Sequence, residues 1–367
     1  MSRAREFADL AVSADAGGLT GRNLIINGAM QVAQRGTSST SDSYRTVDRT
    51  RTNHGGASVT QTQQTLSSGS PYDDGFRYFY RVANTAVSSA TSANMQMFQF
   101  IEAQNIASSG WQYTSPSSYV TFSAWVRSSL AGTYMFRMKT TDGTAQNYAS
   151  KFTLAADTWT KITKTVPGNS NLQFDNNAER GLEVNITVHF GTDFTSSSFV
   201  DDAWAAFAGD SRSDDFDQNW CNTASATFDA TGWQLEIGEQ ATPFEHRSFA
   251  DELQRCMRYF IQSSNDGDTS QFDGANVIFG WGSSTHNATT SAASGFQFKT
   301  KMRAVPTVTL YHQDGTSGAV YRVYDGAKIT GVSAANVSNQ GVMQLSKSTG
   351  FNQGIGYYCS YQADAEL

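Results

Sequence analysis

The chain has 367 residues, of which 39% are hydrophobic, 12% are aromatic and only 16% are charged. Its net charge of −7 argues against nucleic acid as a partner, because phosphate binding needs a basic surface. No apolar run reaches the ~18 residues of a membrane-spanning helix, so we expect no membrane insertion. The N-terminus also lacks the hydrophobic stretch of a signal peptide, so export is not expected.

The uncharged polar residues Ser, Thr, Asn, Gln and Gly make up much of the rest of the composition. This composition favours strands with polar outer faces over helices. Three widely spaced cysteines, Cys221, Cys256 and Cys359, form neither a disulfide framework nor a zinc motif. We therefore predict an all-β protein with reduced cysteines and no cofactor.

A short helix is predicted at the N-terminus, over residues 3–16. Phe7, Leu10 and Ala14 recur at helical spacing, and two glycines follow. The helix would dock on a partner or on its own symmetry mates; the alternative is a flexible arm.

Strand patterns then recur from residue 23 to about 245. The segment "NLIINGAMQVAQRG" (23–36) predicts two strands around an Asn-Gly turn. In "YVTFSAWVR", Val120, Phe122, Ala124 and Val126 alternate with a second set of residues, which is typical of a half-buried antiparallel strand. The second set is Tyr119, Thr121, Ser123, Trp125 and Arg127. Many such strands with polar turns indicate a β-sandwich or jelly roll.

The long connection 192–217 is rich in Ser and Asp, and we expect it at one rim of the sandwich. Asp214, Asp215 and Asp217 are a weak candidate for a cation site, because hard cations prefer clustered oxygens. The glycine and terminal glutamate of an EF-hand loop are missing, and a solvated loop is the alternative.

One capped helix is predicted next, starting at Ser248. Phe249, Leu253, Cys256 and Phe260 follow at spacings of four, three and four, which is the pattern of a seam that packs on another helix. The stripe either covers a sheet of the same chain or brings three copies together around an axis.

A second set of strands runs from residue 271 to the end and is long enough for a smaller β-sandwich. Aromatic rings stack on sugar rings, and amides and carboxylates bind their hydroxyls. The candidate glycan-binding residues are aromatic side chains of this region, Trp281, Tyr311, His312, Tyr321 and Tyr324, with a second patch of Trp111 and Tyr113 in the earlier strands.

No catalytic motif is present in the sequence. The five histidines are scattered, and no acidic pair stands in a motif typical of glycoside hydrolysis. We therefore expect no enzymatic activity.

The junction "GWQLEIGEQATPFEHRSFADELQRCMRYF" (232–260) resembles the one found in many bacteriophage tail-fibre and related virion proteins. There a jelly-roll domain, similar to a carbohydrate-binding module, ends in G-x-Q-L-E-x-G, followed by A-T-x-F-E-x-R and the helix E-L-x-x-C-x-R-Y. "GRNLIINGAMQVAQRGTS", "VTFSAWVRSSLAGTY", "MRAVPTVTLY" and the terminal "ADAEL" are also similar to that family, so the resemblance covers residues 22–367. Thr50 departs from it, since the family has an aromatic residue after the Asp-Arg pair.

The resemblance implies a homotrimeric fibre with four parts: a virion-attachment helix or arm (1–21), a jelly-roll β-sandwich (22–245), a linker helix at the trimer axis (246–262) and a distal β-sandwich at the receptor-binding tip (263–367). Phe7, Leu10 and Ala14 would contact other tail or virion proteins. The expected function is attachment of the virion to host cell-surface polysaccharide without cleavage, after synthesis in the host cytoplasm. The alternatives are a structural capsid-surface or baseplate protein and a polysaccharide depolymerase.

Overall fold

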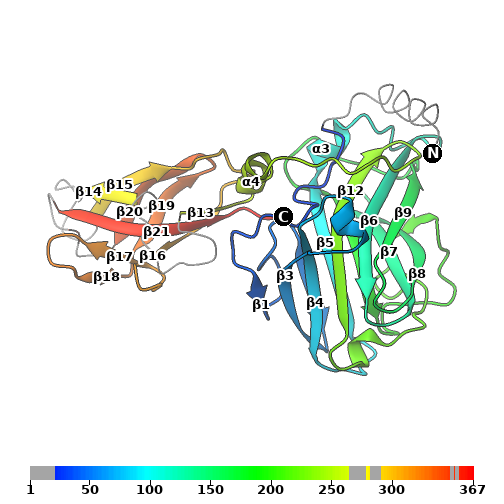
Figure 1. Cartoon of the computed structure of the whole chain (residues 1–367). Helices are drawn as coiled ribbons and strands as arrows, with labels where there is room; N and C mark the ends of the chain where they lie inside the picture. Colours follow the sequence, from blue (N-terminus) through cyan, green and yellow to red (C-terminus); the bar gives the residue numbers. More distant parts are fainter. Residues whose placement is uncertain (1–20, 264–277, 282–290, 348–350, 352–354) are drawn as a thin grey trace. The chain divides into compact units, whose positions relative to one another are not determined.

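The computed structural model describes residues 21–263, 278–281, 291–347, 351 and 355–367. The protein is all-β, with strands in several antiparallel sheets, as predicted. It divides into two units (Figure 1). Unit 1 consists of the residues up to Gln31, of Ser38–Ser248 and of Leu367. Unit 2 consists of Val32–Thr37 and Phe249–Glu366.

Unit 1 is a jelly-roll β-sandwich of two six-stranded antiparallel sheets. We name them sheet A, in the order β1-β3-β4-β12-β6-β9, and sheet B, in the order β11-β8-β7-β10-β5-β2. The strands of sheet A are β1 (Ser38–Ser39), β3 (Ser58–Thr65), β4 (Tyr78–Ala86), β6 (Tyr119–Ser128), β9 (Thr160–Pro167) and β12 (Thr227–Ile237). Those of sheet B are β2 (Arg51–Gly55), β5 (Asn94–Glu102), β7 (Gly132–Thr140), β8 (Gln146–Leu154), β10 (Arg180–Phe190) and β11 (Trp204–Ala206).

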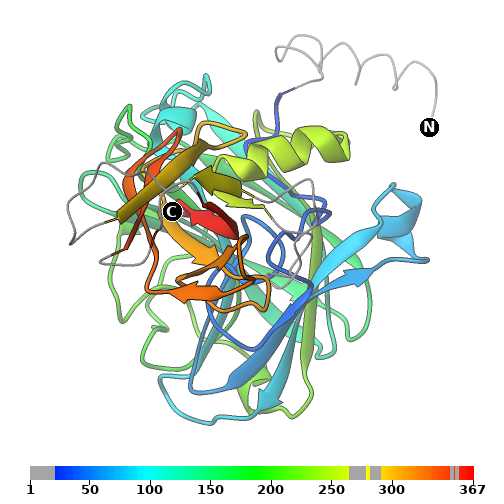
Figure 2. The same ribbon diagram turned by 90° about the vertical axis from the view of Figure 1, so that its left-hand side faces the viewer.

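The helices among the described residues are short. They are α2 (Ser70–Asp73), α3 (Ala103–Ala107) and the 3₁₀ turn η1 (Trp220–Asn222) in unit 1, and α4 (Phe249–Met257), yellow-green in Figure 2, in unit 2.

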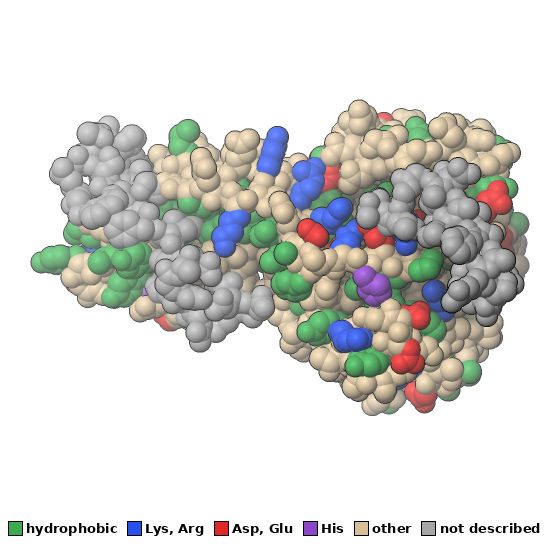
Figure 3. Space-filling model, turned by 45° about the horizontal axis from the view of Figure 1, so that its top comes forward, with side chains coloured by type: hydrophobic (Ala, Val, Ile, Leu, Met, Phe, Trp, Pro, Cys, Tyr) green, Lys and Arg blue, Asp and Glu red, His purple; other side chains and the backbone are tan. Residues whose placement is uncertain are grey.

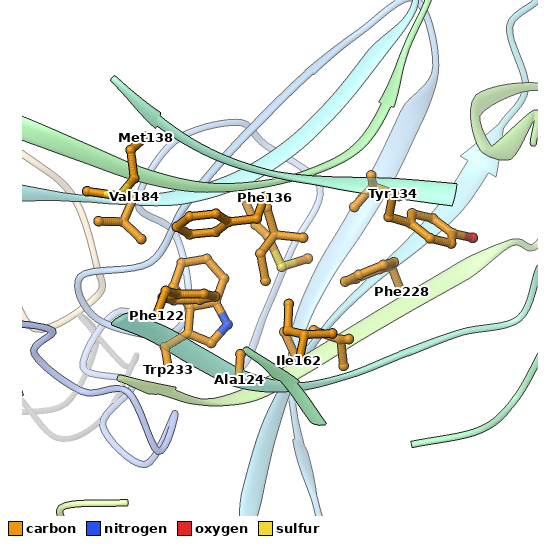
Figure 4. Packing of buried hydrophobic residues seen from close by; sticks show 14 of the residues in the cluster. Phe122, Ala124, Tyr134, Phe136, Met138, Ile162, Val184, Phe228 and Trp233 are labelled. Atoms are coloured by element: carbon orange, nitrogen blue, oxygen red, sulfur yellow. The ribbon is translucent and has the colours of Figure 1, made fainter. Parts of the chain in front are cut away.

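The core of unit 1 lies between the two sheets. Figure 4 shows side chains of sheet A, including Phe122 and Trp233, facing side chains of sheet B, including Phe136 and Val184. The rings of Phe122 and Phe136 stack at 4.6 Å between centroids, and Trp233 meets Phe122 edge-on at 5.6 Å. Because each such side chain stabilises the fold by about 2 kcal/mol on burial, this layer holds the two sheets together.

The alternation seen in β6 is confirmed. Val120, Phe122, Ala124 and Val126 are all buried in the core. Trp125, between two of them, is half-buried on the other face of sheet A. A period of two therefore places the core and the outer face of this strand as the sequence predicts.

Residues 23–36 do not form the two predicted strands, although Asn27 does take the left-handed turn conformation (φ 59°). The backbone amides of this segment bond to side chains instead: Ile25 N–H donates to Asn23 Oδ1, and Ile26 N–H donates to Gln99 Oε1, both at 2.9 Å. Apolar residues here satisfy their backbone groups through buried amide side chains, which an apolar pattern does not reveal.

Unit 2 contains two antiparallel sheets. In the larger one, β21 (Gly356–Asp364) pairs with β13 (Phe260–Gln262), β14 (Ile278–Trp281), β16 (Thr307–Tyr311) and β17 (Ala319–Arg322), and β17 pairs with β18 (Lys328–Thr330). The smaller sheet has the order β15 (Ser291–Gln297), β20 (Gly341–Lys347) and β19 (Ser333–Ser338).

The domain boundaries differ from those predicted. The contact boundary lies at residues 248 and 249, and α4 belongs to unit 2 instead of forming a separate linker. Residues 32–37 also belong to unit 2, where the Arg35 guanidinium lies 3.6 Å from the centre of the Phe260 ring and 3.3 Å from the Glu366 carboxylate. The segment is far from unit 2 in sequence, so composition and turn signals do not predict its placement.

Candidate functional site

Two of the aromatic candidates of unit 2, Tyr311 and Tyr321, form a group on its larger sheet. The register pairs Tyr321 of β17 with Tyr358 of β21, and Tyr311 of β16 with Ser360 of β21. Since residues two apart on a strand share a face, Tyr321, Tyr358 and Tyr311 lie on one face of this sheet. We call these three residues, with Gln362, the tyrosine face.

The tyrosine face has aromatic planes and polar groups side by side. The rings of Tyr321 and Tyr358 are nearly parallel (12°), with centroids 6.2 Å apart. The Tyr311 hydroxyl donates to Gln362 Oε1 at 2.9 Å, and Gln362 Nε2 donates to Gln262 Oε1 at 2.7 Å. All three tyrosines are half-buried, so the rings, the Tyr311 hydroxyl and the Gln362 amide are held in fixed positions.

The remaining candidates of unit 2 have other positions. His312 is buried, with its ring 6.0 Å from that of Tyr321 and Nδ1 at 2.9 Å from the Asp314 carboxylate, so it supports the tyrosine face from below. Tyr324 is 81% exposed in the turn that follows β17. Trp281 ends β14, and its side chain lies outside the described residues.

The second predicted patch is wrong for Trp111, which is a core residue. It is 2% exposed, and its Nε1 donates to the Ser118 carbonyl at 3.2 Å. Tyr113 is half-buried and packs edge-on against Phe174 at 4.9 Å. A ring with no accessible face cannot stack on a sugar, so Trp111 is not part of a binding platform.

The predicted helical seam is also corrected. Helix α4 ends at Met257, so Phe260 lies beyond it, in β13. Cys256 and Phe260 are buried within unit 2, and Leu253 is half-buried. Only Phe249 is largely exposed, at 53%, so most of the stripe packs inside the chain.

The acidic connection does not gather its carboxylates. Asp214 pairs with Lys151, Asp215 accepts from the Thr195 hydroxyl, and Asp217 accepts from Thr133 N–H (2.6 Å) and Oγ1 (2.9 Å). Lys151 holds the pKa of Asp214 below its ordinary value. Asp214, Asp215 and Asp217 thus have separate partners, and within the described ranges no three His, Cys, Asp or Glu side chains are grouped to hold a metal ion.

Phe7, Leu10 and Ala14, the proposed attachment residues, lie outside the described residues. Among the helices that the structure does describe, none is long and apolar enough to cross a bilayer.

The junction motif has a structural role in unit 1. Glu245 accepts from Asn23 N–H at 2.8 Å and is paired with Arg247, whose Nη2 donates to the Asn23 carbonyl at 2.6 Å. Glu236 accepts from Thr242 N–H and its hydroxyl at 2.8 and 2.6 Å. Burial raises the pKa of Glu245, but the hydrogen bonds that Glu245 accepts from the backbone of Asn23 and Gly21 and from Arg247 outweigh this effect, so its pKa is lowered. The motif therefore fixes the segment at Asn23 and the turn at Thr242 beside the end of β12.

The outer face of sheet B is covered by the chain itself. Arg137 of β7 and Asn185 of β10 point away from the core yet are buried. Residues 191–217 lie over them: the Arg212 carbonyl accepts from Asn147 Nδ2 at 3.0 Å, and the Arg212 guanidinium lies 4.4 Å from the centre of the Phe194 ring. Burial lowers the pKa of Arg137 to about 10. Residues 191–217 therefore cover this part of the outer face of sheet B.

The outer face of sheet A carries a cluster that sequence reasoning missed. Trp125 of β6 and Trp159, just before β9, are both half-buried there. Beside them, the Asp229 carboxylate accepts from Arg81 Nε at 2.7 Å and from Arg127 Nη2 at 2.7 Å. We call these five residues the tryptophan face. The available signal was the phase of β6, because Trp125 and Arg127 alternate with core residues.

Charged side chains are a minority on one face of the molecule. On the face of the molecule shown in Figure 3, tan atoms predominate, and charged side chains are dispersed among them. This agrees with the low charged fraction of the sequence.

No family model matches the chain, and no curated protein matches it. Solved structures that it is similar to include the enzymatically active domain of bacteriophage CBA120 tailspike protein 4, with 10% identity, a TM-score of 0.32, and coverage of 59% of this chain and 21% of that one. Another is a family 11 carbohydrate-binding module from Clostridium thermocellum in complex with a mixed-linked tetrasaccharide, with 12% identity, a TM-score of 0.27, and coverage of 56% of this chain and 99% of that one. A third is the module pair of a C. thermocellum xylanase complexed with xylohexaose, with 10% identity, a TM-score of 0.29, and coverage of 59% of this chain and 30% of that one. The match spans about a fifth of the tailspike chain. With TM-scores this low, these likenesses carry no weight, and the fold rests on the sheet order of the chain itself.

Proposed function

We propose that the chain is a homotrimeric, non-enzymatic adhesion protein of a bacteriophage tail fibre, which attaches the virion to host-surface glycans through the tyrosine face of unit 2. Its N-terminal segment, with Phe7, Leu10 and Ala14, would hold it to other virion proteins. It would be made in the host cytoplasm and reach the virion without export.

The observation that carries the glycan-binding proposal is the tyrosine face itself. Tyr321 and Tyr358 present two nearly parallel rings from neighbouring strands, and Tyr311 and Gln362 place a hydroxyl and an amide on the same face. Pyranose rings need a flat apolar surface for their C–H face and donors and acceptors for their hydroxyls. Rigid strands position both with little cost in side-chain entropy.

The virion role is supported by the resemblance of the junction and its flanking segments to tail-fibre proteins. The trimer is supported by that resemblance and by Phe249, an apolar ring that is 53% exposed on α4. A neighbouring copy that covered this ring would remove its apolar surface from water.

The test is binding of the fluorescently labelled full chain to a panel of bacterial strains that differ in their envelope polysaccharides. We expect some strains to be labelled, and Tyr321→Ala and Tyr358→Ala to weaken labelling at least tenfold. Met343→Ala is the matched control, because it truncates a 73% exposed side chain of the same unit away from the larger sheet.

Failure to label any strain would favour a purely structural virion protein. Release of oligosaccharides from the bound polysaccharide would contradict the non-enzymatic role and favour a depolymerase. A stable monomer in sedimentation equilibrium would remove the trimer.

A further inference from the structure

We propose that the tryptophan face of unit 1 is a second glycan-binding site, specific for uncharged pyranose chains. It extends the proposed adhesion function but does not depend on the tyrosine face, since the two sites share no residue. Its experiment can therefore fail while the first succeeds, and the reverse.

The strand register builds the centre of this site. Arg127 of β6 is paired with Asp229 of β12, which is paired in turn with Arg81 of β4. The Asp229 carboxylate is buried and binds both guanidinium groups through Nε and Nη2, at 2.7 to 2.9 Å. Bidentate pairs of this kind fix the plane of each guanidinium. The Nη1 atoms of Arg81 and Arg127 have no hydrogen-bond partner among the described residues, so each still has donors to offer.

The aromatic rings are fixed just as firmly. The Arg127 guanidinium lies 4.7 Å from the centre of the Trp159 ring, and Phe79 meets that ring edge-on at 5.6 Å. Trp125 Nε1 donates to Asp74 Oδ2 at 3.0 Å, which sets the direction of its indole. Both indoles are half-buried: they pack against the cluster of Leu66, Phe76 and Phe79, and the rest of each ring stays open to solvent on the outer face of sheet A.

The surrounding groups match sugar hydroxyls in polarity. The two Nη1 groups donate, and Asp74 Oδ1, which has no hydrogen-bond partner among the described residues, accepts. Thr62 of β3 is paired with Arg81 of β4, and the exposed Thr163 lies two residues beyond Lys161 on β9. Hydroxyl groups therefore border the rings. Sugar hydroxyls both donate and accept, and this mixture of groups serves both roles.

The charges at the site balance, which selects an uncharged ligand. Arg81, Arg127 and Lys161 carry three positive charges, and Asp229, Asp74 and Asp157 carry three negative charges. Asp229 and Asp157 both act on Arg81, and Asp74 lies 3.9 Å from Lys161. A site for uronate or phosphate chains would have an excess of positive charge. Neutral pyranose chains need none.

The first experiment is affinity electrophoresis of the full chain in native gels that contain dextran, mannan, galactan, xylan or mixed-linkage β-glucan, with polygalacturonate as the acidic polymer. We expect at least one neutral polymer to retard the chain. Trp159→Ala and Trp125→Ala should weaken that retardation about tenfold, which is the usual effect of losing one stacking ring. Met343→Ala, which truncates an exposed side chain outside both sites, should leave it unchanged.

The second experiment observes ligand binding in the wild-type chain. The full chain is labelled with 5-fluorotryptophan, and the ¹⁹F resonances of Trp125 and Trp159 are assigned with Trp→Phe variants. Titration with oligosaccharides of the retarding neutral polymer should shift these two resonances and leave those of Trp220 and Trp233, which are fully buried, unmoved.

Three results would overturn the site: no retardation by any neutral polymer, retardation by polygalacturonate alone, or binding that leaves the Trp125 and Trp159 resonances unmoved. If retardation disappears with Tyr321→Ala and not with Trp159→Ala, the glycan binds only at the tyrosine face.

Discussion

Mild acid is expected to destabilise unit 1 through one histidine. His189 of β10 is buried, its ring lies 5.6 Å from that of Phe216, and its Nδ1 has no hydrogen-bond partner among the described residues. Burial lowers the pKa of His189 from 6.5 to about 4, because the imidazolium would lose its hydration without gaining a partner.

The sign follows from proton binding. Between pH 6.5 and about 4 the unfolded chain protonates this histidine and the folded chain does not, so stability falls as pH falls through this range and is unaffected above it. The full difference of about 2.5 pKa units corresponds to about 3 kcal/mol. At about pH 5, where few carboxylates have titrated, the loss amounts to about 2 kcal/mol.

The assay is urea unfolding of the wild type and of His189→Gln at about pH 7.5 and pH 5, followed by tryptophan fluorescence. Six of the seven tryptophans belong to unit 1, so the signal reports that unit. The wild type should lose about 2 kcal/mol more than the variant on acidification. Equal losses would refute the reasoning, because they would mean that His189 titrates alike in the folded and unfolded chains.

Three further changes test the packing and the assembly. Asp229→Ala leaves the guanidinium groups of Arg81 and Arg127, each about a third exposed, without their carboxylate. It should lower the free energy of urea unfolding by about 2 kcal/mol. A change within experimental error would mean that solvent replaces the ion pairs. In Gly28→Ala, the new Cβ would lie 2.0 Å from the Trp233 carbonyl oxygen, so we expect a loss of at least about 3 kcal/mol in the same assay. Gly209→Ala, which has open space around it, is the control, and an equal loss there would contradict the steric explanation. Phe249→Glu should convert the proposed trimer to monomers in sedimentation equilibrium without loss of circular dichroism, and persistence of trimers would place their contact elsewhere.

Local patterns were sufficient for the strands whose two faces differ. Strand β6, for example, lies where the alternation in "YVTFSAWVR" predicts it. In the second set of strands, β15 and β16 follow one another along the chain. They belong to different sheets, and an apolar run does not report where a chain leaves one sheet for another.

Helix α4 illustrates the limit of a periodic pattern. Its start after Ser248 follows from the capping residues, but its stripe fits a neighbouring helix and the interior of its own unit equally well. In the structure, Cys256 and Phe260 are buried inside unit 2, because strand β13 begins three residues after the helix ends.

By itself, then, the sequence determined the all-β class, the position of the junction and the phase of the regular strands, since these depend on periods of two and on local turn and capping chemistry. Only the tertiary structure decided which aromatic residues can meet a ligand. Trp111 and Trp125 have the same chemistry, and Trp111 stands in the more polar stretch of the chain, yet Trp111 is in the core and Trp125 is on the outer face of sheet A. The difference comes from strand register and from the segments that cover each face, which bring together residues more than a hundred positions apart, such as Arg81 and Asp229.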